Sequence, residues 1–413
     1  MIDWGQRAEA LLQELAACSE PGPGVTRLPF TPEHRAALEV LQEAMRRADL
    51  TVSVDAAGTL IGRREGPPGS KTFLLGSHQD SVREGGAYDG IMGVVLPLLA
   101  LEKLRAEGVD LPFAVEILAF ADEEGVRFPT ALIGSRALAG TFDRDVLDMR
   151  DGDGNPLRDA MTTFGLAPDR IGTLARNPDE VIGFLETHIE QGPYLEREGE
   201  AIGVVTAICG IERHQIEVTG ETGHAGTLPM KGRRDALVGA AAIVSEVDRL
   251  GQQTTDLRAT VGALTVEPNV VNAVPRAVRL TAEFRSPDDD IRRKAGDGLH
   301  SFVQELARQR SLTIEATRTY AQDAQPCSAE LSHCLMTAAK ATGARGLTLP
   351  SGATHDASAM ADLCPIAMLF VRCRDGVSHK PEEFAAPADM GAAIVAISHF
   401  LMAVGQQPET YGV

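Results

Sequence analysis

Five short segments carry the residues of this sequence that are best suited to metal chemistry. They are His78-Gln79-Asp80, Tyr88-Asp89-Gly90, Asp122-Glu123-Glu124-Gly125, His188-Ile189-Glu190-Gln191-Gly192 and Ser378-His379. Imidazole nitrogens and carboxylate oxygens are the ligands that Zn, Mn and similar divalent ions take in proteins. Together the segments predict one two-metal hydrolytic site, in which a Glu beside a metal-binding Glu is available as the general base.

The spacing of His78, Asp80 and Asp89 is typical of a metal site at the end of a strand. His78 follows the apolar run 72–75. The carboxylate of Asp80 can accept a hydrogen bond from the second ring nitrogen of His78, which fixes the tautomer of the imidazole. Asp89 lies in a glycine-rich loop that is able to aim its carboxylate inward as a shared ligand. The alternatives are a surface His-x-Asp pair without a role and an Asp that caps the following helix.

Three adjacent acids, Asp122, Glu123 and Glu124, follow a second apolar run at 113–120. Adjacent carboxylates at a buried strand end cost free energy unless cations lie beside them. This run therefore favours a metal site over a solvated acidic loop. Because neighbouring side chains diverge, one carboxylate can bind a metal ion while the next holds a water molecule.

The remaining imidazoles leave a choice of ligands open. His188, taken alone, is more simply explained as a structural histidine with its hydrogen bonds satisfied. His379, which follows Ser378, and His355, which precedes Asp356, compete for the role of the last ligand.

Size, charge and cysteine content limit the class of protein. A chain of 413 residues exceeds one ordinary hydrophobic core and predicts two domains. A net charge of −19 argues against nucleic-acid and anionic-membrane partners, so local Arg side chains must bind any anionic substrate. The six cysteines include no Cys-x-x-Cys pair, the first residues do not resemble a signal peptide, and there is no run of 18 apolar residues. We therefore expect reduced thiols, a cytoplasmic location and no membrane span.

The hydrophobic pattern predicts an α/β fold with polar residues at the ends of strands. Apolar residues at helical spacing alternate with short apolar runs of strand length. The expected helices are 6–17, 35–48 and 91–106, and the expected strands are 72–75, 113–120, 183–189 and 365–371. This order indicates a mixed sheet whose site lies at the strand ends.

The pattern changes at about residue 211, where alternating segments indicate half-exposed antiparallel strands. The alternating segments are 215–219 and 278–284, and the helical patterns that accompany them are 234–250 and 289–309. Together they predict a compact α+β unit. We therefore expect a discontinuous catalytic di-metal domain, 1–210 and 328–413, interrupted by an inserted ferredoxin-like domain, 211–327.

Three polar residues of the inserted region are placed to reach a substrate. His224 follows a strand and could donate to a developing oxyanion, and Asn272 offers an amide. Arg285 could bind a carboxylate through two parallel hydrogen bonds. The simpler alternatives are a capping His, a turn Asn and an Arg in a surface ion pair.

Many motifs, taken in order from about residue 70 to 385, resemble one known family. They are Gly76-Ser77-His78-Gln79-Asp80-Ser81-Val82, Gly86-Ala87-Tyr88-Asp89-Gly90, Asp122-Glu123-Glu124-Gly125-Val126-Arg127-Phe128, His188-Ile189-Glu190-Gln191-Gly192, Gly223-His224-Ala225-Gly226-Thr227, Arg233-Arg234-Asp235-Ala236, Asn272-Ala273-Val274-Pro275, Ser351-Gly352-Ala353-Thr354-His355-Asp356-Ala357 and Gly376-Val377-Ser378-His379. The family is the amidase, hydantoinase and carbamoylase group of the M20 metallopeptidase clan. It includes allantoate amidohydrolases, N-carbamoyl-L-amino-acid hydrolases and β-ureidopropionases.

The resemblance implies a role for each candidate residue. One divalent ion would be held by His78, Asp89 and His188, and the other by Asp89, Glu124 and His379. Glu123 would be the general base, and Asp80 would orient His78 without binding metal. The residues expected to meet the substrate are His224, as a catalytic group, and Asn272, Arg285, Gln191, His355 and Ile211. The ions would be Zn or Mn, with Co as an alternative, and the inserted domain would act as a lid and form a homodimer.

The resemblance also implies a substrate class, a small ureido (carbamoyl) compound with a carboxylate. Three segments look most like allantoate amidohydrolases, which makes allantoate the expected substrate: Phe128-Pro129, 134–140 and 370–373. Ile211 departs from that pattern, because those enzymes often carry Gln there, and so does Thr354, where Gly is usual. The alternatives are an N-carbamoyl-L-amino-acid hydrolase or β-ureidopropionase, then an N-acyl amino acid or peptide hydrolase, and finally a catalytically dead binding protein on the same fold.

Overall fold

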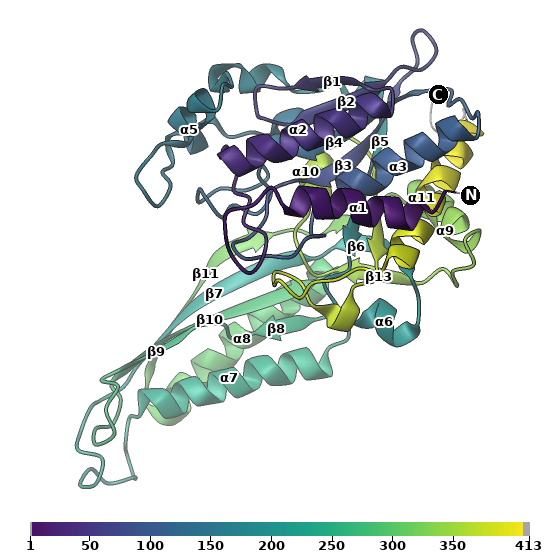
Figure 1. Cartoon of the computed structure of the whole chain (residues 1–413). Helices are drawn as coiled ribbons and strands as arrows, with labels where there is room; N and C mark the ends of the chain where they lie inside the picture. Colours follow the sequence, from purple (N-terminus) through teal and green to yellow (C-terminus); the bar gives the residue numbers. More distant parts are fainter. Residues whose placement is uncertain (1, 408–413) are drawn as a thin grey trace. The chain divides into compact units, whose positions relative to one another are not determined.

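The computed structural model describes residues 2–407 and divides them into two compact units (Figure 1). Ala207–Pro326 and Pro350–Ala353 form the second unit, and the rest of the described chain forms the first. The domain boundaries expected from the sequence, 210/211 and 327/328, lie close to the points where the chain passes from one unit to the other, 206/207 and 326/327. The short segment Pro350–Ala353 groups with the second unit, although the sequence analysis placed it in the catalytic domain.

The first unit is built on a mixed sheet, which confirms the expected α/β class. Its strands, in spatial order, are β1 (Thr51–Val54), β2 (Leu60–Arg64), β4 (Ala114–Phe120), β3 (Thr72–His78), β5 (Val181–Ile189), β14 (Ile366–Val371) and β6 (Ile202–Ile208), with β13 (Thr348–Ser351) also paired to β6. The four central strands, β4, β3, β5 and β14, are mutually parallel, whereas β1, β2 and β6 pair antiparallel with their neighbours.

The parallel strands explain where the polar segments meet. Every residue of β3, β4, β5 and β14 is buried, as expected for strands covered on both faces. Because parallel strands end at the same edge of the sheet, His78, the acidic run after β4 and the end of β5 arrive at one place.

Helices of the first unit bury this sheet. The longer ones are α1 (Trp4–Ala16), α2 (Pro32–Arg47), α3 (Met92–Ala106), α9 (Ala329–Lys340) and α11 (Pro387–Gly405). The shorter ones are α4 (Ile133–Ala139), α5 (Leu157–Thr163), α6 (Tyr194–Glu198) and α10 (Asp356–Met360), with 3-10 turns η1 (Arg144–Asp148), η2 (Pro168–Thr173), η3 (Pro178–Glu180) and η4 (Arg374–Gly376). Helix α2 begins before the expected range because Thr31 accepts a hydrogen bond from His34 N and Pro32 fits the first helical position.

Helix α11 bears on the expectation that the chain has no membrane span. By length and composition it is the one helix among residues 2–407 that could cross a membrane. It packs against α1, α3 and α9, and α3 in turn packs on β3 and β5 (Figure 1). Most of its large apolar residues, Phe400 and Leu401 among them, are buried in the core of the first unit, which is the behaviour of a core helix.

The second unit is an antiparallel sheet with two helices, as the alternating pattern predicted. Its strands run in the order β11 (Thr313–Gln322), β7 (Gly210–Thr219), β10 (Ala277–Ser286) and β8 (Arg258–Thr260), and β9 (Leu264–Glu267) also pairs with β10. The two-residue β12 (Gln325–Pro326) pairs with the end of β6. The helices are α7 (Ala236–Gln253) and α8 (Asp289–Arg310).

Alternation along β7 and β10 gives this unit its own core. Ile216 and Val218 of β7 and Phe284 of β10 are buried together with Ile243 of α7 and Leu299 of α8. Residues between them on the strands face the other way and are mostly exposed or half-buried. A period of two with one apolar face is what a sheet covered by helices on one side requires.

Candidate metal centre

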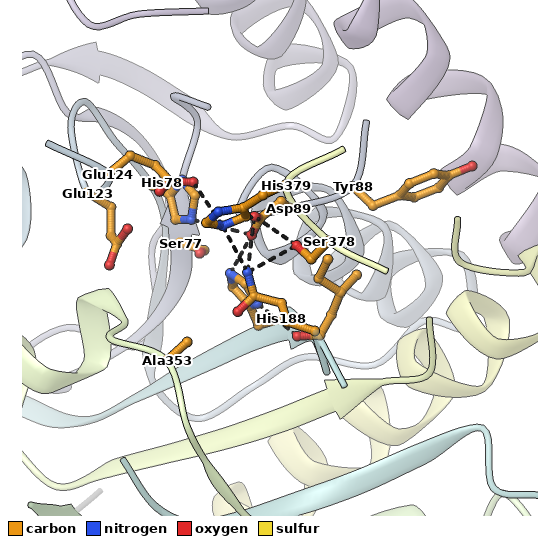
Figure 2. A network of polar contacts seen from close by, with 12 residues as sticks. Ser77, His78, Tyr88, Asp89, Glu123, Glu124, His188, Ala353, Ser378 and His379 are labelled. Atoms are coloured by element: carbon orange, nitrogen blue, oxygen red, sulfur yellow. Dashed lines mark hydrogen bonds and ion pairs between the residues drawn. The ribbon is translucent and has the colours of Figure 1, made fainter. Parts of the chain in front are cut away.

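The carboxyl edge of the parallel strands gathers the histidines and carboxylates that the sequence singled out (Figure 2). His78 ends β3 and His188 lies near the end of β5, while the other residues come from the loops after β3, β4 and β14. Four groups of possible ligands have atoms within 4.8 Å of one another, and three of these groups contain Asp89 or Glu124. These three are His78/Asp89/His188, His78/Glu123/Glu124 and Asp89/Glu124/His379. Two of these are the ligand sets that the family resemblance implied, with Asp89 shared.

Asp89 is the centre of the cluster. Its Oδ1 lies 3.1 Å from His188 Nε2 and 3.9 Å from His78 Nε2, and its Oδ2 lies 3.0 Å from His379 Nε2. Within residues 2–407, buried Oδ1 accepts no hydrogen bond of regular geometry. Ring nitrogens and a carboxylate oxygen that converge on one point without hydrogen bonding suit a shared metal ligand.

The two buried histidines present the same ring nitrogen to Asp89 for the same reason. His78 Nδ1 lies 3.0 Å from the carbonyl oxygen of Asp80, and His188 Nδ1 lies 2.9 Å from the carbonyl oxygen of Ile189. A carbonyl oxygen can only accept, so each Nδ1 is the protonated nitrogen. Each Nε2 then keeps its lone pair for a metal ion.

Asp80 also fixes the acidic loop. Its two carboxylate oxygens accept hydrogen bonds from the backbone N–H groups of Glu123 (3.0 Å) and Glu124 (3.2 Å). One oxygen is 3.5 Å from His78 Nδ1. Asp80 therefore orients one imidazole through its backbone carbonyl and positions both glutamates through its carboxylate, which exceeds the role that the sequence assigned to it.

The electrostatics of the cluster call for positive charge. Burial raises the pKa of Glu123 well above its ordinary value and that of Glu124 to about 7. At Asp89, burial acts to raise the carboxyl pKa, but the adjacent imidazoles of His188 and His379 outweigh burial and hold that pKa well below its usual range. Between residues 2 and 407, histidines alone form ion pairs with these acids, and no Lys or Arg does. Two divalent cations fit this donor set and would supply the charge.

The sequence analysis missed two buried glutamates that hold the site in place. Glu383 accepts hydrogen bonds from the backbone N–H groups of Tyr88 (3.0 Å) and Asp89 (2.9 Å) and from Ser378 Oγ (2.9 Å). Glu186 accepts from Ser77 Oγ (2.6 Å). The acid at 186 within an apolar strand was a usable signal, whereas Glu383 follows a polar turn and gave none.

Gln191 and His355, both expected near the substrate, lie against the metal cluster. The Gln191 amide donates to Asp89 Oδ2 (3.1 Å) and to Ser378 Oγ (3.2 Å). The buried ring of His355 packs edge-on against His188, with centroids 4.5 Å apart. His379 is the imidazole beside Asp89 and Glu124, whereas His355 shares a group with Glu186 and His188. Tyr88 points away from the cluster (Figure 2) and bonds Glu9.

The four candidate residues of the second unit form two pairs. Ile211 and Arg285 are partners in the register of β7 and β10, and Arg285 donates to Glu283 and to the carbonyl oxygen of Gly352. His224 lies beyond the other end of β7 and is exposed. Its backbone forms an isolated antiparallel β-bridge with Ala273, the residue after Asn272. Ten-residue β7 separates its ends by about 30 Å. The pairs therefore cannot meet the same small molecule within one copy of this unit.

Comparisons with known proteins show which family this chain resembles over most of its length. The model of peptidase family M20/M25/M40 matches residues 74–403. An N-carbamoyl-L-amino-acid amidohydrolase of Paenarthrobacter aurescens is 41% identical over 92% of this chain and 93% of its own length. An allantoate deiminase of Arabidopsis thaliana is 36% identical over 95% of this chain and 81% of its own length. A Burkholderia multivorans amidase of the hydantoinase/carbamoylase family superposes with a TM-score of 0.90 at 33% identity, covering 96% of this chain and 97% of its own.

Gly90→Ala tests whether the close approach of Gly90 to His78 sets the metal geometry. A Cβ at Gly90 (φ +65) would lie 2.2 Å from the His78 ring. We expect a loss of about ten- to hundredfold in zinc affinity, measured by competition with a chelator. Gly108→Ala is the matched control, since Gly108 has φ +69 and open space around it. Both substitutions carry the same backbone strain, so equal zinc affinities in the two variants would contradict the prediction.

Proposed function

The chain belongs to peptidase family M20/M25/M40 and is a hydrolase of carbon–nitrogen bonds, and we propose that its substrate is a small carbamoyl (ureido) carboxylate held beside two divalent ions. The family expected from the order of the motifs is thereby confirmed. The observation that carries the proposal is the convergence of three imidazoles and Glu124 on the buried carboxylate of Asp89. The ions would be Zn or Mn, since these ligands serve both.

Among ureides, N-carbamoyl-L-amino acids are our first candidate and allantoate is the second. Relatives with both names are found, so allantoate, the substrate expected from the sequence, stays a prediction. The higher identity to an N-carbamoyl-L-amino-acid amidohydrolase favours the simpler ureide. Ile211 supports the same order, because a buried isoleucine offers no hydrogen bond to the second ureido group of allantoate.

Glu123 is the residue we assign to proton transfer. Metal ions bound by this cluster would polarise the carbamoyl carbonyl and lower the pKa of water. Glu123 forms a ligand group with His78 and Glu124, and Asp80 fixes its backbone. In this position it would take a proton from the attacking water and return it to the leaving nitrogen. Its buried surroundings exclude competing solvent.

Glu123→Gln should separate catalysis from metal binding. We expect kcat to fall by about 10²–10⁴-fold with metal content unchanged, because the amide cannot accept the proton. The neighbouring Glu124→Gln is the contrast, for which activity and bound metal should be lost together. Elemental analysis and steady-state kinetics give both quantities. A Glu123→Gln variant with near-normal kcat would remove Glu123 from the base role.

The substrate assignment is tested with a panel of ureides. Protein stripped by a chelator and then reloaded with Zn²⁺ or Mn²⁺ is assayed for ammonia release from several N-carbamoyl-L-amino acids, their D-enantiomers, N-carbamoyl-β-alanine and allantoate. We expect metal-dependent turnover that is fastest on an N-carbamoyl-L-amino acid. Faster turnover of allantoate would reverse the order of the two candidates. Full activity after exhaustive chelation would contradict the two-metal proposal itself.

A homodimer would resolve the separation of the two residue pairs in the second unit. Arg285 would bind the substrate carboxylate in its own subunit, and His224 with Asn272 would reach the site of a partner copy. Two-fold dimers are the commonest oligomers, and they present the same surface twice. Exposed apolar side chains of the second unit, including Val270 and Val271, are consistent with such a contact. Under this proposal the second unit serves as both lid and dimerisation domain.

Mixing two inactive variants tests the exchange of His224 between subunits. His224→Ala and Glu123→Gln are each expected to be nearly inactive. After the subunits are allowed to exchange, half of the dimers would carry one site with both residues intact. Activity should then recover to about a quarter of the wild-type value. No recovery, in a mixture shown by mass spectrometry to contain heterodimers, would place His224 in its own subunit's site or outside catalysis.

A further inference from the structure

A buried arginine outside the candidate ligand set contacts the turn that carries His78 and Asp80. Arg27 is 2% exposed and lies between α1 and α2. It and Lys103 are the buried Lys and Arg side chains in the described part of the first unit, and Lys103 pairs with Glu107 on its own helix. In residues 2–407, Arg27 has no carboxylate within ion-pair distance. A buried cation without an ion pair calls for a physical reason.

The guanidinium joins the metal-site turn to the end of α1. Its Nε donates to the carbonyl oxygen of Gln79 at 2.6 Å. Its Nη1 donates to the carbonyl oxygens of Leu15 (2.9 Å) and Cys18 (3.2 Å). Carbonyl oxygens at a helix C-terminus lack helical partners and carry partial negative charge, so they stabilise the cation. Although burial lowers the pKa of Arg27 to about 10, the group stays protonated at neutral pH.

The backbone of Arg27 holds the other side of the same turn. Arg27 N donates to Ser81 Oγ (2.9 Å), and Ser81 N donates to the carbonyl oxygen of Arg27 (3.1 Å). The side chain of Gln79 contacts the ring of His34, which also belongs to the N-terminal segment. Arg27 therefore holds the chain on both sides of Asp80. It forms one hydrogen bond with the carbonyl oxygen of Gln79 and two with Ser81.

The position of this turn governs more than one candidate ligand. Asp80 orients His78 through Nδ1 and holds the backbone N–H groups of Glu123 and Glu124. A shift of the Gln79–Asp80 peptide would therefore move one ligand of each metal ion and the candidate base together. Metal affinity is sensitive to such outer contacts because ligand geometry must hold within tenths of an ångström.

We propose that Arg27 is a positioning residue for the metal centre, which its planar guanidinium maintains by bonding the Gln79 carbonyl and the end of α1 at the same time. The inference rests on the proposed two-metal function. It extends that function to the N-terminal segment, which lies before the residues 74–403 matched by the family model. A lysine in the same place would keep the charge but could not reach both groups with a rigid fork of donors.

Arg27→Lys tests the proposal without substrate. The probes are Zn²⁺, titrated in competition with a chromophoric chelator, and Co²⁺, whose visible absorption reports ligand geometry. We expect about tenfold weaker zinc affinity and an altered cobalt spectrum. In turnover assays kcat should fall more than KM rises. Arg35→Lys is the matched control, because Arg35 is exposed on α2 and bonds Phe164 rather than the metal-site turn.

A wild-type zinc affinity and cobalt spectrum in Arg27→Lys would overturn the proposal, whatever the stability of the variant. Ser81→Ala, which removes the hydroxyl that accepts from Arg27 N and donates to the carbonyl oxygen of Val25, provides a second and milder variant. It should weaken zinc binding in the same direction, and it replaces Arg27→Lys if that chain does not fold. Should the wild-type protein bind zinc but hydrolyse no ureide, the proposed substrate would fail while the role of Arg27 would stand.

Discussion

The concentration of buried carboxylates around Asp89 is the constraint on which the rest of the first unit depends. Asp89, Glu123 and Glu124 lie close together at one edge of the sheet. Within the described residues, the ion pairs that Asp89 and Glu124 form are all with histidines. Such a cluster is unfavourable without additional positive charge. Divalent cations bound there would relieve the repulsion, so the same groups that cost folding free energy would supply metal affinity.

Rigid surroundings are needed to keep these groups in register. The four parallel strands provide the frame, and carboxylates that bind backbone N–H groups provide the fine positions. Glu383 holds the Asp89 loop, and Asp80 holds Glu123 and Glu124. Arg27, which is not a candidate ligand, makes contacts of the opposite kind. Its cationic side chain donates to backbone carbonyl oxygens, whereas Glu383 and Asp80 are anions that accept from backbone N–H groups. Each contact acts on the main chain, which limits the freedom of a ligand more than a bond to the end of its side chain would.

The second unit is held by a different buried network. Arg292 of α8, 1% exposed, donates to the carbonyl oxygen of Ile211 and to Asp323. It thereby ties the start of β7 to the residues that follow β11, at the two points where the chain enters and leaves this unit. Ile211, which we propose to bear on substrate choice, is therefore held through its backbone carbonyl. The proposed metal centre and the residues proposed to select the substrate thus lie in separate units, each with its own buried arginine.

The sequence alone determined the chemistry. The residue types show which side-chain atoms can bind a cation. The apolar runs before His78 and Asp122 predicted that these atoms lie at strand ends, and this was possible because hydrophobic periodicity is a local property of the chain. The order of the motifs identified the family. The sequence also predicted the α+β insert, since alternation over a few residues is enough to show one buried face. Glu186 could have been found in the same way, as an acid inside an apolar strand.

Only the tertiary structure decided how these residues are supported. It placed His379 beside Asp89 and Glu124 and His355 against His188, a choice between two His-bearing loops that local pattern left open. It also revealed Glu383 and Arg27, which lie outside the segments that the sequence analysis singled out and bond backbone atoms far away in sequence. Backbone N–H and carbonyl groups are nearly the same in every residue, so the sequence does not show which of them a given side chain will bond. That choice is fixed only when the chain is folded.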